Sequence, residues 1–143
     1  SRCFDAVQFH GGESPAVVAS VPLRRIVAFP VAGREDLERV RDYDGVADAF
    51  LFDAKRGGQS GGTGEVFDWN VLRGVDFARP IILAGGLGPE NVRRAIERAG
   101  PAAVDLNSRL ERAPGVKDPG RMEEVMRALG RVRRPEAEKG DER

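Results

Sequence analysis

The chain has 143 residues, enough for one globular domain and too few for two of ordinary size. Lys and Arg total 23 and Asp and Glu total 23, so the balance gives no basis for attraction to nucleic acid or to an anionic membrane. One cysteine and one histidine exclude an internal disulfide framework and argue against a zinc site, and no apolar run approaches the roughly 18 residues of a membrane span. These totals predict a cytoplasmic enzyme or binding domain without a metal ion. Ser1 stands where Met is usual and strand-like sequence begins at once, so we expect a chain that is cut at its start.

The first half of the chain alternates short apolar runs with more polar, helix-like stretches. Pro15 suits the first turn of a helix, and Leu37, Val40 and Val46 recur at helical spacing among charged residues. The strands predicted here are Phe4 to Phe9, Arg25 to Pro30 and Ala49 to Asp53, and the helices are Ser14 to Ser20 and Arg34 to Tyr43.

The second half continues the alternation. It predicts a weak helix at Asn70 to Gly74, a strand at Pro80 to Ala84, a helix from Pro89 to Gly100, a strand at Ala102 to Leu106, a loop with one helical turn from Asn107 to Asp118, and a helix from Gly120 to Arg131. In the last helix Met122, Val125, Met126 and Leu129 should face inward. Residues 133–143 are charged and lack apolar spacing, which predicts a disordered tail after a domain of residues 1–132.

This order of elements predicts an α/β fold. Strands and helices alternate five times without a tight hairpin signal between strands, which requires parallel strands joined by right-handed crossovers. Five such units in about 130 residues fit a (β/α)8 barrel, the TIM-barrel family, only if about three units are missing. The pattern alone fits an open five-stranded sheet equally well.

Glycine-rich loops follow the predicted strands and indicate a binding site. The strand that ends at Asp53 leads into a segment with five glycines between residues 57 and 64. A second glycine pair, Gly85-Gly86, follows the next strand. Glycine allows the backbone N–H groups to approach phosphate oxygens closely, and parallel folds build their sites at this edge of the sheet. The alternative interpretation is that Asp53 caps a loop and the glycine pairs form ordinary turns.

Several motifs stand in one order along the chain. They are Val7-Gln8-Phe9-His10-Gly11, Gly61-Gly62-Thr63-Gly64 with Phe67-Asp68-Trp69, Leu83-Ala84-Gly85-Gly86-Leu87 with Asn91-Val92, Val104-Asp105-Leu106-Asn107-Ser108, and Pro114-Gly115-Val116-Lys117-Asp118. Together they closely resemble the phosphoribosylanthranilate isomerases of tryptophan biosynthesis, which are (β/α)8 barrels. The resemblance covers Ala6 to Asp118 and implies that the chain corresponds to barrel units four to eight.

The resemblance implies a reaction and the residues that perform it. The reaction is the Amadori rearrangement of N-(5'-phosphoribosyl)anthranilate to 1-(2-carboxyphenylamino)-1-deoxyribulose 5-phosphate, with no cofactor and no metal. Asp53 matches the family's general acid. The residues expected to hold the substrate phosphate are Gly62, Thr63, Gly64, Gly85, Gly86, Ser108 and Arg109. His10 ends a strand at the same face, where it either contacts the substrate or makes structural hydrogen bonds.

Two departures from the family pattern affect these expectations. Arg109 stands where the family usually has glycine, so either its backbone still reaches the phosphate or its side chain adds a charge. The family's general base, a cysteine that ends the first strand, and an arginine after the second strand have no counterpart. Cys3 precedes its strand and should lie at the opposite end of the barrel. We therefore expect the isolated chain to be inactive and to need the missing N-terminal barrel units as a partner.

Two alternatives remain open. One is another phosphosugar barrel enzyme, such as a relative of indole-glycerol-phosphate synthase, although no predicted strand ends in the lysine that such an enzyme needs. The other is a half-barrel that binds a phosphosugar without catalysis. A strand ending in Cys-Gly upstream of Ser1 would favour the isomerase.

Overall fold

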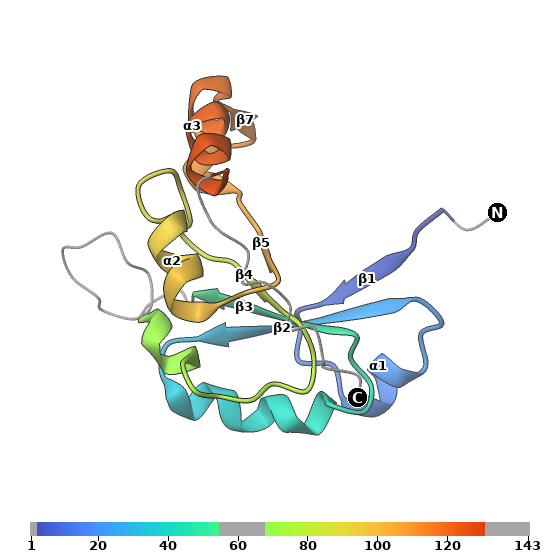
Figure 1. Cartoon of the computed structure of the whole chain (residues 1–143). Helices are drawn as coiled ribbons and strands as arrows, with labels where there is room; N and C mark the ends of the chain where they lie inside the picture. Colours follow the sequence, from blue (N-terminus) through green and yellow to red (C-terminus); the bar gives the residue numbers. More distant parts are fainter. Residues whose placement is uncertain (1–2, 55–67, 131–143) are drawn as a thin grey trace, which may run out of the picture.

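The computed structural model describes residues 3–54 and 68–130 of the chain. Strands alternate with helical segments along most of it, and the chain then forms a hairpin and a last helix (Figure 1). In chain order the elements are β1 (Ala6–Phe9), α1 (Pro15–Ala19), β2 (Arg24–Val31), η1 (Arg34–Tyr43), β3 (Ala49–Ala54), η2 (Trp69–Leu72), β4 (Ile81–Leu83), α2 (Val92–Ala99), β5 (Ala103–Val104), η3 (Ser108–Leu110), β6 (Glu111–Ala113), β7 (Val116–Lys117) and α3 (Pro119–Leu129), where η marks a 3-10 helix.

The five strands β1 to β5 form one sheet in sequential order, and all four neighbouring pairs are parallel. This confirms the predicted α/β class and the parallel sheet. Because parallel strands share one direction, the loops that leave their carboxyl ends gather at one edge of the sheet. Any site built by those loops must lie at that edge.

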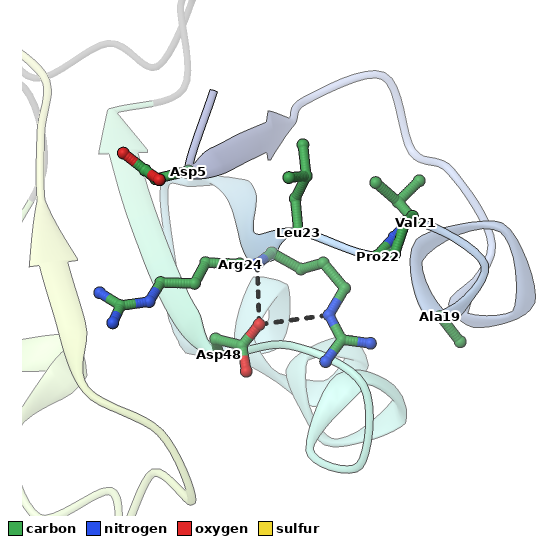
Figure 2. A pocket seen from close by; sticks show the side chains of 8 residues that line it. Asp5, Ala19, Val21, Pro22, Leu23, Arg24 and Asp48 are labelled. Carbon is green, nitrogen blue, oxygen red and sulfur yellow. Dashed lines mark hydrogen bonds and ion pairs between the residues drawn. The ribbon is translucent and has the colours of Figure 1, made fainter. Parts of the chain in front are cut away.

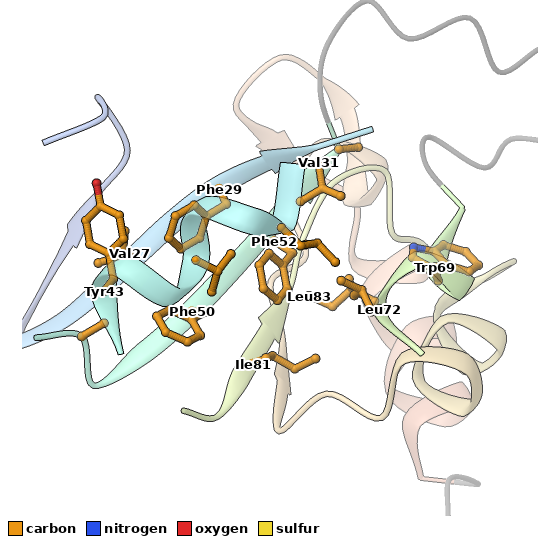
Figure 3. Close-up of a cluster of buried hydrophobic side chains, with 14 of the residues drawn as sticks. Val27, Phe29, Val31, Tyr43, Phe50, Phe52, Trp69, Leu72, Ile81 and Leu83 are labelled. Atoms are coloured by element: carbon orange, nitrogen blue, oxygen red, sulfur yellow. The ribbon is translucent and has the colours of Figure 1, made fainter. Parts of the chain in front are cut away.

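The core lies between the sheet and the helical segments that cover one of its faces (Figure 3). The strand register places Val27, Phe50 and Ile81 in one row across the sheet, all buried. The next row along the strands consists of Phe29, Phe52 and Leu83, which are at most 1% exposed. Other residues of this core include Val18 of α1, Leu37, Val40 and Tyr43 of η1, Leu72 and Trp69 of η2 and Ala95 of α2.

The segment Arg34–Tyr43 has the predicted bounds, but it is a 3-10 helix. Leu37, Val40 and Tyr43, its buried residues, lie three positions apart. A 3-10 helix has three residues per turn, so such residues lie directly above one another and form a single buried stripe. Val46 was expected to continue this face, but it lies beyond the helix and is only partly buried.

The segment predicted as a loop after β5 contains a hairpin, since β6 and β7 pair antiparallel. The predicted helical turn is present as η3, but the prediction of a loop for the rest of this segment was wrong, because β6 and β7 form a separate two-stranded sheet. Pro114 and Gly115 provide the turn, and the φ of Gly115 is +76°. Proline followed by a glycine of positive φ is typical of a type II turn, so the sequence did contain a signal.

The helices α2 and α3 also differ in part from prediction. The helix α2 begins at Val92, later than Pro89, and it ends as predicted at Gly100, whose φ of +58° closes the helix. In α3 only Val125 is buried, whereas Met122 is 44% exposed and Met126 is 64% exposed. The expectation that both methionines face inward was wrong for the described residues. The predicted tail of residues 133–143 lies outside them.

None of the helices in the described ranges is both long and apolar enough to cross a membrane.

Candidate active site at the carboxyl edge of the sheet

A cavity of about 390 Å³ lies where the chain leaves β3, β4 and β5. Its lining comes from the end of β3 and from the two loops that follow β4 and β5. The lining residues are Asp53, Ala54, Ala84, Gly85, Gly86, Leu87, Asp105, Asn107, Ser108 and Arg109. The cavity therefore sits at the edge where parallel α/β folds bind their ligands.

Asp53 reaches this cavity because of its position in β3. It is the exposed residue near the end of an otherwise buried strand. Gly85, in the loop after β4, packs directly against it: a Cβ added to Gly85 would lie 2.5 Å from Oδ1 of Asp53 and 2.4 Å from the backbone nitrogen of Ala54. Only glycine allows the two segments to approach so closely.

The loop after β4 adopts a backbone that favours glycine, with φ of +83° at Gly85 and +64° at Gly86. Asn91, which is only 4% exposed, holds this loop in place through two hydrogen bonds. Its Oδ1 accepts a hydrogen bond from the backbone nitrogen of Gly88 at 2.9 Å, and its Nδ2 donates one to the carbonyl oxygen of Gly86 at 3.0 Å. Because the oxygen and the nitrogen of the side-chain amide both form hydrogen bonds within the loop, Asn91 restricts the orientation of the Gly86 carbonyl group.

The loop after β5 is held by the hairpin that follows it. Lys117 of β7 donates from Nζ to the carbonyl oxygen of Asn107 at 3.0 Å and to its Oδ1 at 2.5 Å. The same ammonium group bonds Oε1 of Glu111 at 2.8 Å. The hydrogen bond from Lys117, followed by one from the backbone of Gly115, lowers the pKa of Glu111. This arrangement supports the segment that contributes Asn107 and Ser108 to the cavity.

Three charged side chains meet beside the cavity, and we call them the Glu90 cluster. Glu90 precedes α2, Arg109 belongs to η3 and Arg121 belongs to α3. Nη1 of Arg109 donates to Oε1 of Glu90, and Nη2 of Arg121 lies 3.6 Å from Oε2. Burial alone would raise the pKa of Glu90, but its own backbone N–H, the hydrogen bond from Arg109 and the charges of Arg109 and Arg121 lower it overall.

The structure brings five of the predicted site residues together around the cavity: Asp53, Gly85, Gly86, Ser108 and Arg109. Gly62, Thr63 and Gly64 lie outside the described residues. His10 is exposed directly after β1 and does not line this cavity.

Asp105 was missed as a site residue, although it lines the cavity directly after β5. Its backbone nitrogen donates to the carbonyl oxygen of Leu83 at 2.8 Å, which continues the pairing of β4 and β5 toward this edge. The rule that singled out Asp53, an acid at the carboxyl end of a parallel strand, applies equally to Asp105.

A larger cavity, about 730 Å³, lies at the amino ends of β1, β2 and β3 (Figure 2). There Oδ2 of Asp48 accepts hydrogen bonds from the backbone nitrogen of Arg25 at 2.8 Å and from its Nε at 3.2 Å. These bonds, the backbone one foremost, lower the pKa of Asp48. Because the amino edge of a parallel sheet serves stability rather than chemistry, we assign this ion pair a structural role. Exposed Cys3 precedes β1 at the same edge, as expected from the sequence.

Comparison with known proteins identifies one family. The family model described as N-(5'phosphoribosyl)anthranilate (PRA) isomerase matches residues 2–128. An N-(5'-phosphoribosyl)anthranilate isomerase from Petrotoga mobilis is 45% identical over 118 residues, which is 82% of this chain and 57% of that protein.

Solved structures of phosphoribosyl anthranilate isomerases have the same fold over the matched region. The structure from Thermotoga maritima gives a TM-score of 0.76 at 34% identity, over 90% of this chain and 62% of that one. Another was solved in complex with reduced 1-(o-carboxyphenylamino)-1-deoxyribulose 5-phosphate, and it gives 0.74 at 32% identity over 88% of this chain and 60% of that one. The chain thus spans about three fifths of the length of the relatives it matches.

Proposed function

This chain belongs to the N-(5'-phosphoribosyl)anthranilate isomerase family, and on that premise we propose that it carries the phosphate site and the general acid of such an isomerase. The observation that supports this most directly is the cavity in which Asp53 meets the two loops that follow β4 and β5. The proposed reaction is the Amadori rearrangement of N-(5'-phosphoribosyl)anthranilate in tryptophan biosynthesis. A cytoplasmic location is part of the same proposal.

The substrate phosphate is proposed to bind between the loops after β4 and β5. Gly85 and Gly86 have no side chains to obstruct an approaching oxygen, and Asn91 holds their loop in place. Ser108 adds a hydroxyl group from the facing loop, and Arg109 adds a guanidinium group. Loops after successive strands form the recurring phosphate site of (β/α)8 barrels. The related structure with a bound deoxyribulose 5-phosphate supports a ligand of this class.

Asp53 is proposed to start the reaction. Its carboxyl group donates a proton to the ribose ring oxygen while the bond from C1' to that oxygen breaks, which leaves an iminium group between C1' and the anthranilate nitrogen. A base then removes the C2' proton, and the electrons of that bond form the C1'–C2' double bond of an enol amine. Transfer of the enol proton to C1' gives the ketose 5-phosphate. Gly85 packs against Asp53 and limits where its carboxyl group can point.

The general base and the group that binds the anthranilate carboxylate are proposed to come from further βα units that complete the barrel. Within the described residues β1 and β5 each pair with one strand only. On the face of the sheet away from the helices, Gln8 is exposed and Ile82 is partly exposed, whereas its neighbour Leu51 is 4% exposed. At about 25 cal/mol per Å² of apolar surface, each ~100 Å² that further units would cover adds about 2.5 kcal/mol, against a domain stability of about 5–15 kcal/mol.

The experiment compares the isolated chain with a completed barrel. The completed barrel is the same chain with the remaining units supplied, either fused to it or added as a separate fragment. We expect the isolated chain to sediment as oligomers or aggregates, because the edges of β1 and β5 offer unpaired backbone groups to other chains. The completed barrel should sediment as a defined species and convert the substrate. A strictly monomeric isolated chain that converts the substrate unaided would contradict the incomplete-barrel proposal.

A further inference from the structure

The Glu90 cluster joins three segments, of which the one with Arg109 lines the cavity proposed to hold the phosphate. Glu90 lies in the turn between the Gly85-Gly86 loop and α2, and Arg109 both lines the cavity and contacts Glu90. Arg121 reaches the other carboxylate oxygen from α3. The carboxylate of Glu90 is therefore shared by two guanidinium groups at the border of the cavity.

The carboxylate of Glu90 also folds back over the glycine loop. A Cβ added to Gly88 would lie 2.7 Å from Oε2 of Glu90, so the carboxylate rests against the backbone of that loop. Glu90 is thus close to the segment that the ligand phosphate would contact. A negative charge at this position acts on any anion that enters the cavity.

The charges of the cluster do not cancel. Because the pKa of Glu90 is lowered, the residue is ionised at neutral pH, and two guanidinium groups face one carboxylate. Of the three residues, only Arg109 lines the cavity, and its side chain is 31% exposed, so a ligand in the cavity can reach this guanidinium group. Carboxylate and phosphate both suit the forked donors of a guanidinium group, so the two compete for the same N–H groups.

We propose that Glu90 sets the affinity of the cavity for phosphate by competing with the ligand's phosphate group for the guanidinium group of Arg109. This inference rests on the proposed function, in which the cavity binds the phosphate of a sugar phosphate. When the cavity is empty, the ion pair with Glu90 holds Arg109 in place. When substrate or product binds, the same ion pair competes with its phosphate group and weakens the binding of both. Binding that is equal for both does not lower the chemical barrier, so weaker phosphate binding favours release of the product without loss of catalysis.

The test measures the dissociation constant of inorganic phosphate for the completed barrel by equilibrium dialysis. Glu90→Gln keeps the shape of the side chain and removes its charge. We expect it to lower the dissociation constant about two- to fivefold, the scale of an exposed charge pair. Arg109→Gln should raise it by a similar factor. The double variant should match Arg109→Gln within about twofold, because Glu90 acts through Arg109.

Glu97→Gln is the matched control, since Glu97 pairs with Arg93 on the exposed surface of α2, away from the lining of the cavity. It should leave the dissociation constant unchanged. The inference is overturned if Glu90→Gln leaves binding unchanged or weakens it, if Glu97→Gln has the same effect, or if the double variant keeps the gain of Glu90→Gln. It is also overturned if the wild-type completed barrel binds no phosphate saturably. Turnover of the completed barrel is measured separately. If turnover is absent but the phosphate dissociation constants of the variants change as expected, only the isomerase proposal is contradicted. If turnover is present but Glu90→Gln leaves the phosphate dissociation constant unchanged, only this inference is contradicted.

Discussion

Replacing Gly85 by alanine should damage both the stability of the fold and the position of Asp53. Gly85 has a φ of +83°, and its added Cβ would lie 2.4 Å from the nitrogen of Ala54 and 2.5 Å from Oδ1 of Asp53. The backbone conformation costs alanine about 1–2 kcal/mol. The collision with the backbone nitrogen of Ala54, which cannot rotate away as a side chain can, adds about 1–3 kcal/mol. The free energy of unfolding of the completed barrel should therefore fall by roughly 2–5 kcal/mol.

Gly74→Ala separates the two causes. Gly74 has a similar φ of +71°, but an added Cβ there meets nothing within 4 Å. Its loss of stability should be confined to the backbone term of about 1–2 kcal/mol, and turnover should be retained. Urea unfolding and steady-state kinetics of both variants provide the comparison. If Gly85→Ala costs no more than Gly74→Ala and keeps the wild-type kcat, then the contact between Gly85 and Asp53 does not matter as described here.

Two further predictions concern residues that support the sheet edges. Asn91→Ala should lower the free energy of unfolding, measured with urea, by about 1–3 kcal/mol, because it leaves the Gly88 N–H and the Gly86 carbonyl without their buried partner, and it should weaken phosphate binding. If neither the free energy of unfolding nor phosphate binding changed, Asn91 would not hold this loop in place. Asp48→Asn should cost less than about 1 kcal/mol at pH 7, since the side chains of this ion pair are 26% exposed in Arg25 and 43% in Asp48. The pKa of Asp48 is lowered in the folded state, so its contribution is present above the ordinary value of 3.8 and is lost as the pH falls below it. Urea unfolding of wild type and variant should therefore converge at acidic pH, and a difference that persists there would show a cause other than the charge.

The sequence predicted the sheet and much of the site for clear physical reasons. Short apolar runs identified all five parallel strands, because strands of parallel sheets are typically nearly continuous apolar runs. The position of Asp53 at the end of such a strand predicted its place at the cavity. Asp105 obeys the same rule and was missed only because the rule was applied to one strand.

Other features depended on contacts that a sequence does not display. The ion pair between Glu90 and Arg109 joins residues 19 positions apart, and nothing in either local sequence indicates it. Asn91 was quoted only as part of a motif, whereas its role follows from its burial and its two hydrogen bonds. Helical spacing predicted that Met122 and Met126 face a core, but periodicity gives no information on which segment, if any, covers a given face.

The most direct test of the proposed chemistry is the kcat of the completed barrel with Asp53→Asn. The amide keeps the shape of the side chain and cannot donate the proton as a carboxylic acid does, while the loops that are proposed to hold the phosphate are unchanged. We expect kcat to fall by about two to four orders of magnitude with little change in substrate binding, and Asp48→Asn at the opposite edge should keep wild-type turnover. Near-normal kcat in the Asp53→Asn variant would contradict the assignment of Asp53 as the general acid.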